Sequence, residues 1–72
     1  MAAPIRLLDV VALTEDVSVM RLLRGQVGTV VEVLAPEVYE VEFCDDEGRT
    51  YTSTALSASR LLVLRYRPQI TA

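Results

Sequence analysis

The side chains that most often perform catalysis are scarce in this chain. Its 72 residues include no histidine, and Cys44 is the single cysteine. Asp45 and Asp46 follow Cys44 directly, and neighbouring carboxylates disfavour the thiolate that a nucleophilic cysteine requires. The absence of histidine also removes the commonest general base. We therefore expect Cys44 to be a structural or surface thiol, and we expect no enzyme activity, no catalytic residue and no cofactor.

Carboxylates are the second group with chemical potential. The acidic run at residues 45–48 resembles part of a calcium-binding loop, but the ligand spacing of an EF-hand is missing. One cysteine without histidine cannot form a cysteine-based zinc site. We interpret the run as a solvated hairpin turn in which Gly48 adopts a positive φ. Adventitious binding of Ca²⁺ or Mg²⁺ is the alternative, and no dedicated metal site is expected.

Two glycines three residues apart, Gly25 and Gly28, invite comparison with a phosphate-binding loop. The Lys-Ser/Thr ending of such a loop and the helix after it are both missing, so we reject that interpretation. Gly25 fits a turn before a strand, and Gly28 fits a bulge or a tight bend. The Gly-x-x-Gly-Thr-Val string at residues 25–30 also resembles the KOW-type motif of ribosomal and transcription proteins. A nucleic-acid-associated barrel is therefore the alternative function.

The charges are sorted along the chain. The net charge is -3, the pI is about 4.7, and every basic residue is an arginine. Residues 37–48 hold six carboxylates and no base, whereas residues 49–72 hold four arginines and no acid. Because phosphate binding relies on clustered basic residues, nucleic acid is not the expected partner. The basic and aromatic cluster near the C-terminus could stack on RNA. We expect it instead to belong to a last strand whose arginines pair with the acidic hairpin; its members are Arg60, Arg65, Tyr66 and Arg67.

Length and composition predict one domain over residues 1–72, with an ordered core over about residues 6–66. The absence of a long apolar run predicts no membrane span, and the lone cysteine favours the cytoplasm. Hydrophobic residues make up 51% of the chain. A domain of this size buries only about 60% of the surface of its unfolded chain. The apolar residues therefore exceed what a small core can hide.

The hydrophobic pattern is that of strands rather than helices. We predict strands over residues 7–13, 27–34, 38–44, 49–54 and 61–65. A long first loop with a helical turn should cover residues 17–24, and a connector with a 3₁₀ turn should precede the last strand. Five short strands in so few residues cannot form a sandwich, whereas closure covers the strand edges. We therefore predict an all-β fold, a small five-stranded SH3-like barrel.

The alternation between apolar and charged residues predicts which side chains form the core. Tyr39, Val41 and Phe43 should point inward, since Glu40 and Glu42 take the other face. The same reasoning adds further inward residues, which are Val27, Val31, Val33, Leu7, Val11 and Leu62. The apolar surplus then falls on residues 17–23 and on Val30, Leu34 and Val38.

Loop lengths predict the register of the two hairpins. In the first, Glu32 should face Glu40 and Val33 should face Tyr39. The like charges cost a few tenths of a kcal/mol, which the core outweighs. In the second hairpin, Phe43 should face Thr50 and Glu42 should face Tyr51.

Four segments together resemble a known family. They are residues 8–16, residues 23–32 with the string RGQVGTVVEV running to residue 33, residues 38–43 with the string YEVEF, and residues 49–51. The chain resembles the DUF4926 family of small bacterial, largely cyanobacterial, proteins over roughly residues 6–66. The resemblance implies an SH3-like barrel of unassigned function with no catalytic residues. It also implies an antitoxin-like or adaptor role beside a neighbour-encoded partner.

One departure from that family bears on function. The first loop is expected to be polar, yet it carries five apolar residues, which are Val17, Val19, Met20, Leu22 and Leu23. Exposed apolar patches usually mark interfaces, and methionine is a common adaptable contact. The outward carboxylates Glu32, Glu40 and Glu42 would complement a basic partner. We therefore expect a protein-interaction module that binds a protein partner or forms a homo-oligomer.

Overall fold

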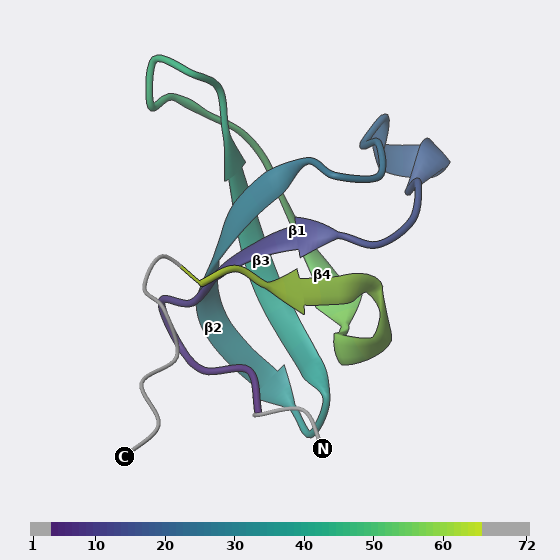
Figure 1. The fold of residues 1–72 in the computed structure, drawn as a ribbon, viewed down its shortest axis with the longest axis vertical. Helices are drawn as coiled ribbons and strands as arrows, with labels where there is room; N and C mark the ends of the chain where they lie inside the picture. Colours follow the sequence, from purple (N-terminus) through teal and green to yellow (C-terminus); the bar gives the residue numbers. More distant parts are fainter. Residues whose placement is uncertain (1–3, 66–72) are drawn as a thin grey trace.

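The computed structural model describes residues 4–65, which form an all-β fold without an α-helix (Figure 1). The strands are β1 (Val10–Leu13), β2 (Val27–Ala35), β3 (Val38–Cys44), β4 (Thr50–Ser57) and β5 (Leu61–Val63). Two short 3₁₀ helices lie in the connections, η1 (Ser18–Met20) before β2 and η2 (Ala58–Arg60) before β5. Over these residues no helix has the length and apolar character needed to cross a membrane. The prediction of five strands, a long first loop and a 3₁₀ turn before the last strand is confirmed.

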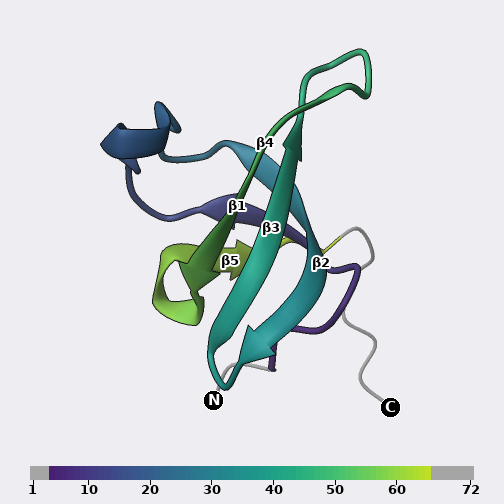
Figure 2. The same ribbon diagram turned by 180° about the vertical axis from the view of Figure 1, so that it is seen from behind.

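All five strands belong to one sheet in the order β4-β3-β2-β1-β5, and every neighbouring pair is antiparallel. The long hairpin of β2 and β3 curves strongly, and the short strands β1 and β5 cross it at a steep angle (Figures 1 and 2). The end strands β4 and β5 do not pair with each other within residues 4–65. Ladder hydrogen bonds therefore do not close the described sheet into a ring.

The first strand is shorter than predicted because the chain turns before it. Asp9 donates its backbone N–H to the Arg6 carbonyl (3.1 Å) and accepts the Arg6 N–H on Oδ2 (2.9 Å). Leu8 takes a left-handed backbone conformation with φ +71°. The turn leaves the neighbouring Leu7 exposed, and Leu62 is exposed on β5 as well. The predictions that Leu7 and Leu62 belong to the core are wrong, whereas Val11 is fully buried as predicted.

The inward face of β3 is the centre of the core. Tyr39, Val41 and Phe43 are buried, as their alternation with glutamates predicts. Side chains from the other strands and from the first loop complete the cluster, and they are Val11, Leu13, Val17, Leu22, Val30, Leu56 and Leu61. Every strand therefore contributes at least one buried apolar side chain.

Three residues of β2 that were predicted to belong to the core are not buried. Val27, Val31 and Val33 are 47%, 38% and 53% exposed, whereas Val30 is fully buried. Val30 faces Val41, yet Glu32 faces Glu40, so Val31 is one extra residue on β2 and forms a β-bulge. The predicted facing pairs Glu32–Glu40 and Val33–Tyr39 are confirmed beyond the bulge. Before it, the register shifts by one residue, so Val30 takes the core side and Val27 the outer side. Val33 keeps the side of Tyr39, but it is exposed near the end of the hairpin.

The predicted register of the second hairpin is also wrong. Phe43 faces Thr52 and Glu42 faces Ser53, two residues beyond the predicted partners. One residue of this two-residue difference arises in the turn, where the Asp45 N–H donates to the Arg49 carbonyl (2.9 Å). The other comes from an irregularity between Phe43 and Cys44. Gly48 has φ +82° in this turn, as predicted. β4 stays paired with β3 as far as Ser57, so it is longer than the predicted strand.

Gly28 lies in the regular part of the β2–β3 ladder, opposite Phe43, and not at the bulge that the sequence suggested. A Cβ at this position would lie 2.7 Å from Val41 Cγ1, 2.9 Å from the Glu42 carbonyl oxygen and 2.9 Å from Phe43 Cδ1. These distances are shorter than van der Waals contact, and one of the atoms is backbone. Glycine is therefore required here by the close packing of two strands.

Gly28→Ala is expected to lower the free energy of unfolding by about 1–3 kcal/mol, the usual cost of overpacking a core. Denaturant titration with a linear extrapolation measures this change. Gly48→Asn is the matched control, because a Cβ there meets nothing within 4 Å and asparagine tolerates positive φ. Stability of Gly28→Ala equal to that of the original chain would contradict the close approach of β2 and β3.

Candidate functional site

The loop between β1 and β2 is anchored in the core by two of its apolar residues. Val17 donates its N–H to the Leu22 carbonyl (2.8 Å), and Leu22 donates its own to the Val17 carbonyl (3.2 Å). Their side chains are 6% and 1% exposed and belong to the hydrophobic core. Both residues were predicted to contact a partner, but they fill the interior because the loop folds back on itself at this bridge. They are therefore not part of an exposed surface.

Two of the remaining apolar side chains are exposed, and we call this pair, Val19 and Leu23, the loop tip, although Leu23 follows directly after the Val17–Leu22 bridge. Val19 lies in η1 and is 89% exposed, and Leu23 is 62% exposed. Met20 is half-buried and packs against the core cluster. Arg21 ends η1 in a left-handed conformation with φ +59°, which lets the chain reverse towards Leu22. Of the five predicted loop residues, Val19 and Leu23 are thus the two that face solvent.

Backbone hydrogen bonds hold the base of the loop in place. Arg24 donates its N–H to Asp16 Oδ1 (2.8 Å), and Gly25 donates its N–H to the Leu13 carbonyl (2.8 Å). Gln26 accepts a hydrogen bond from the Leu23 N–H on its side-chain oxygen. Gly25 has φ +91°, as expected of a turn residue before a strand. The exposed side chains of Val19 and Leu23 therefore project from a loop with a defined backbone.

The predicted acidic residues lie on one face of β2 and β3. Glu40 faces Glu32 across the ladder, and Glu42 faces Thr29, so all three carboxylates stand on the same side of the sheet. Glu40 Oε2 accepts a hydrogen bond from the hydroxyl of Ser53 at 2.6 Å. This contact from β4 offsets part of the repulsion between Glu32 and Glu40. The structure brings these carboxylates together as predicted.

The structure does not join the acidic face to the loop tip. The loop leads into β2 at Val27, whereas Glu32 lies in the second half of that strand. A strand rises about 3.3 Å per residue, so Glu32 lies on the order of 15 Å along β2 from Val27, whereas Glu42, opposite Thr29, lies nearer the loop. One small ligand at the loop therefore cannot cover the whole acidic face.

The arginines do not pair as the sequence suggested. Arg60 Nε lies 3.1 Å from Glu15 Oε2, in the first loop and not in the acidic hairpin. Arg49 pairs inside its own turn, with Nε 3.2 Å from Asp45 Oδ2 and Nη2 2.8 Å from Glu47 Oε2. The predicted pairing of Arg60 with the acidic hairpin is wrong, because η2 carries Arg60 to the other end of the sheet. Tyr66 and Arg67 lie outside the described residues.

The acidic turn and Cys44 are solvent-facing. Asp45 Oδ1 accepts the backbone N–H groups of Glu47 (3.0 Å) and Arg49 (2.9 Å), so this carboxylate stabilises the turn itself. Cys44 is an exposed free thiol. Within residues 4–65, no three side chains of the types His, Cys, Asp and Glu come together as a cation site requires.

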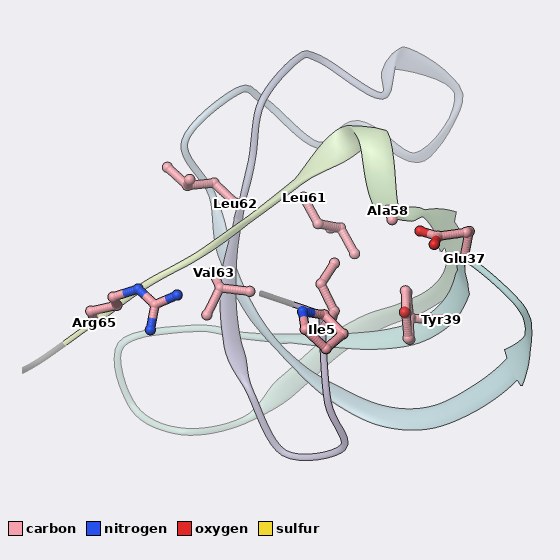
Figure 3. Close-up of a pocket in the computed structure, with 9 residues that line it drawn as sticks. Ile5, Glu37, Tyr39, Ala58, Leu61, Leu62, Val63 and Arg65 are labelled. Carbon is pink, nitrogen blue, oxygen red and sulfur yellow. The ribbon is translucent and has the colours of Figure 1, made fainter. Parts of the chain in front are cut away.

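A groove that the sequence did not indicate lies between the N-terminal segment, the start of β3, η2 and β5 (Figure 3). Its volume is about 490 Å³, within the range of ligand sites. The lining residues are Pro4, Ile5, Glu37, Tyr39, Ala58, Leu61, Leu62, Val63 and Arg65. Four separate segments supply them, and none of the four carries a motif, so the sequence holds no signal for this groove.

The chain matches the family model described as "Domain of unknown function (DUF4926)" over residues 7–63. The protein therefore belongs to the DUF4926 family, as the resemblance of its strand motifs led us to expect. No curated protein and no solved structure matches the chain.

The division of the first loop into core and tip residues can be tested by replacing single side chains with alanine. Leu22→Ala is expected to lower the free energy of unfolding by about 2–4 kcal/mol, because it leaves a cavity in the core. Val19→Ala is the matched loop control and should change it by less than about 0.5 kcal/mol, as is usual for an exposed side chain. Denaturant titration measures both. Equal losses for the two variants would show that the tip also packs on the core.

Proposed function

We propose that this protein is a non-enzymatic interaction module, antitoxin-like or adaptor-like, that binds a neighbour-encoded protein or a second copy of itself in the cytoplasm. The scaffold would be a small SH3-like barrel. The order β4-β3-β2-β1-β5, the long β1–β2 loop and the 3₁₀ turn between β4 and β5 support this fold assignment. The strong curvature of the sheet supports it as well (Figure 2).

The observation that carries the proposal is the display of Val19. A valine that is 89% exposed gains nothing from folding, yet the chain holds it at the tip of a hydrogen-bonded loop. The buried residues Val17 and Leu22 fix this loop on both sides of the tip. A preorganised apolar contact loses little conformational freedom on binding, which raises affinity. Contiguous exposed apolar patches are typical of interfaces, and we propose that Val19 and Leu23 together form such a patch.

The acidic face supports the same function with a different contribution. Glu32, Glu40 and Glu42 concentrate negative charge on one side of the sheet. Surface charge of one sign accelerates association with an oppositely charged partner and contributes less to final affinity. We therefore propose that the loop tip supplies affinity and that the acidic face selects a basic partner.

A nucleic-acid-associated barrel is favoured less. It requires arginines on a face free of carboxylates, but Arg49 pairs with Asp45 and Glu47, and Arg60 pairs with Glu15. Phosphate groups would have to displace these carboxylates. Enzyme activity is also not proposed, since the chain has no histidine and Cys44 stands among carboxylates.

The proposal predicts that the loop tip controls binding. The neighbour-encoded protein is co-expressed with this chain, and their affinity is measured by isothermal titration calorimetry. Val19→Asp combined with Leu23→Asp should weaken binding by about tenfold or more, because it places charge in an apolar contact. Light scattering at micromolar concentration tests self-association with the same variant.

Val19→Asp alone is therefore measured beside Leu34→Asp as its matched control, since each adds one negative charge and Leu34 is an exposed apolar position at the far end of β2. Leu34→Asp should leave affinity within about twofold of the original chain. The proposal fails if the protein is strictly monomeric and the neighbour-encoded protein does not bind. Salt-sensitive binding of RNA at low ionic strength would favour the nucleic-acid function instead.

A further inference from the structure

The groove beside β5 has an apolar floor and charged ends. Ile5, Ala58 and Val63 are half-buried and pack against the core, with Tyr39 and Leu61 beneath them. Figure 3 shows the carboxylate of Glu37 at one end and the guanidinium of Arg65 at the other, with the apolar side chains between them. Neither charged group makes an ion pair within residues 4–65. The groove therefore offers an apolar site between a negative and a positive charge.

The end of the groove at Glu37 is fixed by the backbone. Ala58 donates its N–H to the Glu37 carbonyl (2.9 Å), and this bond ties the β2–β3 connection to η2. Glu37 itself takes a left-handed conformation with φ +64°. This hydrogen bond consequently fixes the backbone of Glu37 relative to Ala58, which belongs to the apolar floor of the groove.

The free edge of β5 runs along the same groove. Leu64 donates its N–H to the Val10 carbonyl (2.9 Å), and Arg60 accepts the N–H of Thr14 on its carbonyl (2.9 Å). Bonds to one neighbour recur at every second residue of an antiparallel strand, so the even-numbered residues of β5 bond to β1. The N–H and C=O of Val63 then point away from β1. No strand within residues 4–65 covers this edge.

We propose that the groove and the edge of β5 bind an extended peptide segment of a partner protein by strand addition. Antiparallel pairing with β5 places one peptide residue opposite Val63, on the inward face of the sheet, where an apolar side chain enters the groove. The peptide residues two before and two after it lie beside Arg65 and Leu61. Because Glu37 lies at the Leu61 end, the matching segment reads acidic-x-apolar-x-basic.

This site is distinct from the loop tip and goes beyond the proposed function, since it specifies the chemistry of a peptide segment that binds beside β5. Backbone hydrogen bonds to Val63 would supply affinity without sequence preference. The apolar residue and the two charges would supply specificity and direction.

The test uses the full chain and blocked nonapeptides in a threonine background. One peptide carries aspartate, leucine and arginine at its third, fifth and seventh positions, and a second carries the two charged residues exchanged. Titration is followed by the backbone amide signals in two-dimensional NMR. The first peptide should shift the signals of Ile5 and Val63 and bind about tenfold more tightly than the second, since exchange turns two attractions into two repulsions.

A charge exchange on the protein makes the test independent of any change in stability. Glu37→Arg combined with Arg65→Glu should reverse the preference and bind the second peptide more tightly. Asp46→Asn, a change in the distant acidic turn, should keep the preference of the original chain. A reversed preference supports the proposal even if both affinities fall.

Three outcomes overturn the proposal. They are no binding to the full chain at millimolar peptide, equal affinity for the two peptides, and shifts confined to β4 or to the first loop. The peptide titration does not involve the neighbour-encoded protein. A negative result in this titration therefore does not contradict the proposed role of the loop tip. Loss of the loop-tip effect would likewise leave the peptide result unchanged.

Discussion

The β-bulge at Val31 is the constraint on which the rest of the structure depends. One extra residue lets β2 place Gly28 and Val30 on the core side of its first half, while Glu32 remains opposite Glu40 in its second half. Without it, one of the two registers would run the length of the strand. Thr29 would then replace Gly28 opposite Phe43, or Glu32 would turn to the core side opposite Tyr39. The bulge also increases the local twist and bends the strand. That bend lets β1 and β5 cross the long hairpin and complete the core from the other side (Figure 1).

Much of the fold could be predicted from local pattern. The strict alternation of Tyr39, Val41 and Phe43 with glutamates determines both the strand and its buried face. The bulge could not be predicted, because Val30 and Val31 are adjacent valines and either of them is a suitable inward residue. The register of the second hairpin was predicted wrongly for a related reason. Cys44 and the turn residues after it are compatible with several loop lengths, and an irregularity between Phe43 and Cys44 adds one residue to the offset.

The sequence does not predict which apolar residues of the first loop are buried and which are exposed. Val17, Val19, Leu22 and Leu23 are similar aliphatic residues within one loop, and composition does not distinguish those that anchor from those that are displayed. The distinction arises from the two-bond bridge between Val17 and Leu22 and from the left-handed turn at Arg21. The acidic face was predictable, since period-2 alternation places Glu40 and Glu42 on one side. The groove could not be predicted, because its walls come from segments that are far apart in the sequence, including the N-terminal segment and β5.

The pairing of β1 with β5 has a consequence for how the chain acquires its structure. β2, β3 and β4 form a meander whose contacts are local in sequence, so they can assemble early. Val11, however, faces Val63, more than fifty residues away along the chain. During synthesis on the ribosome, the side of the core that β5 covers therefore stays exposed until β5 has been made. Addition of β5 therefore completes the core. A chain truncated before β5 would leave apolar side chains exposed and would be prone to aggregate.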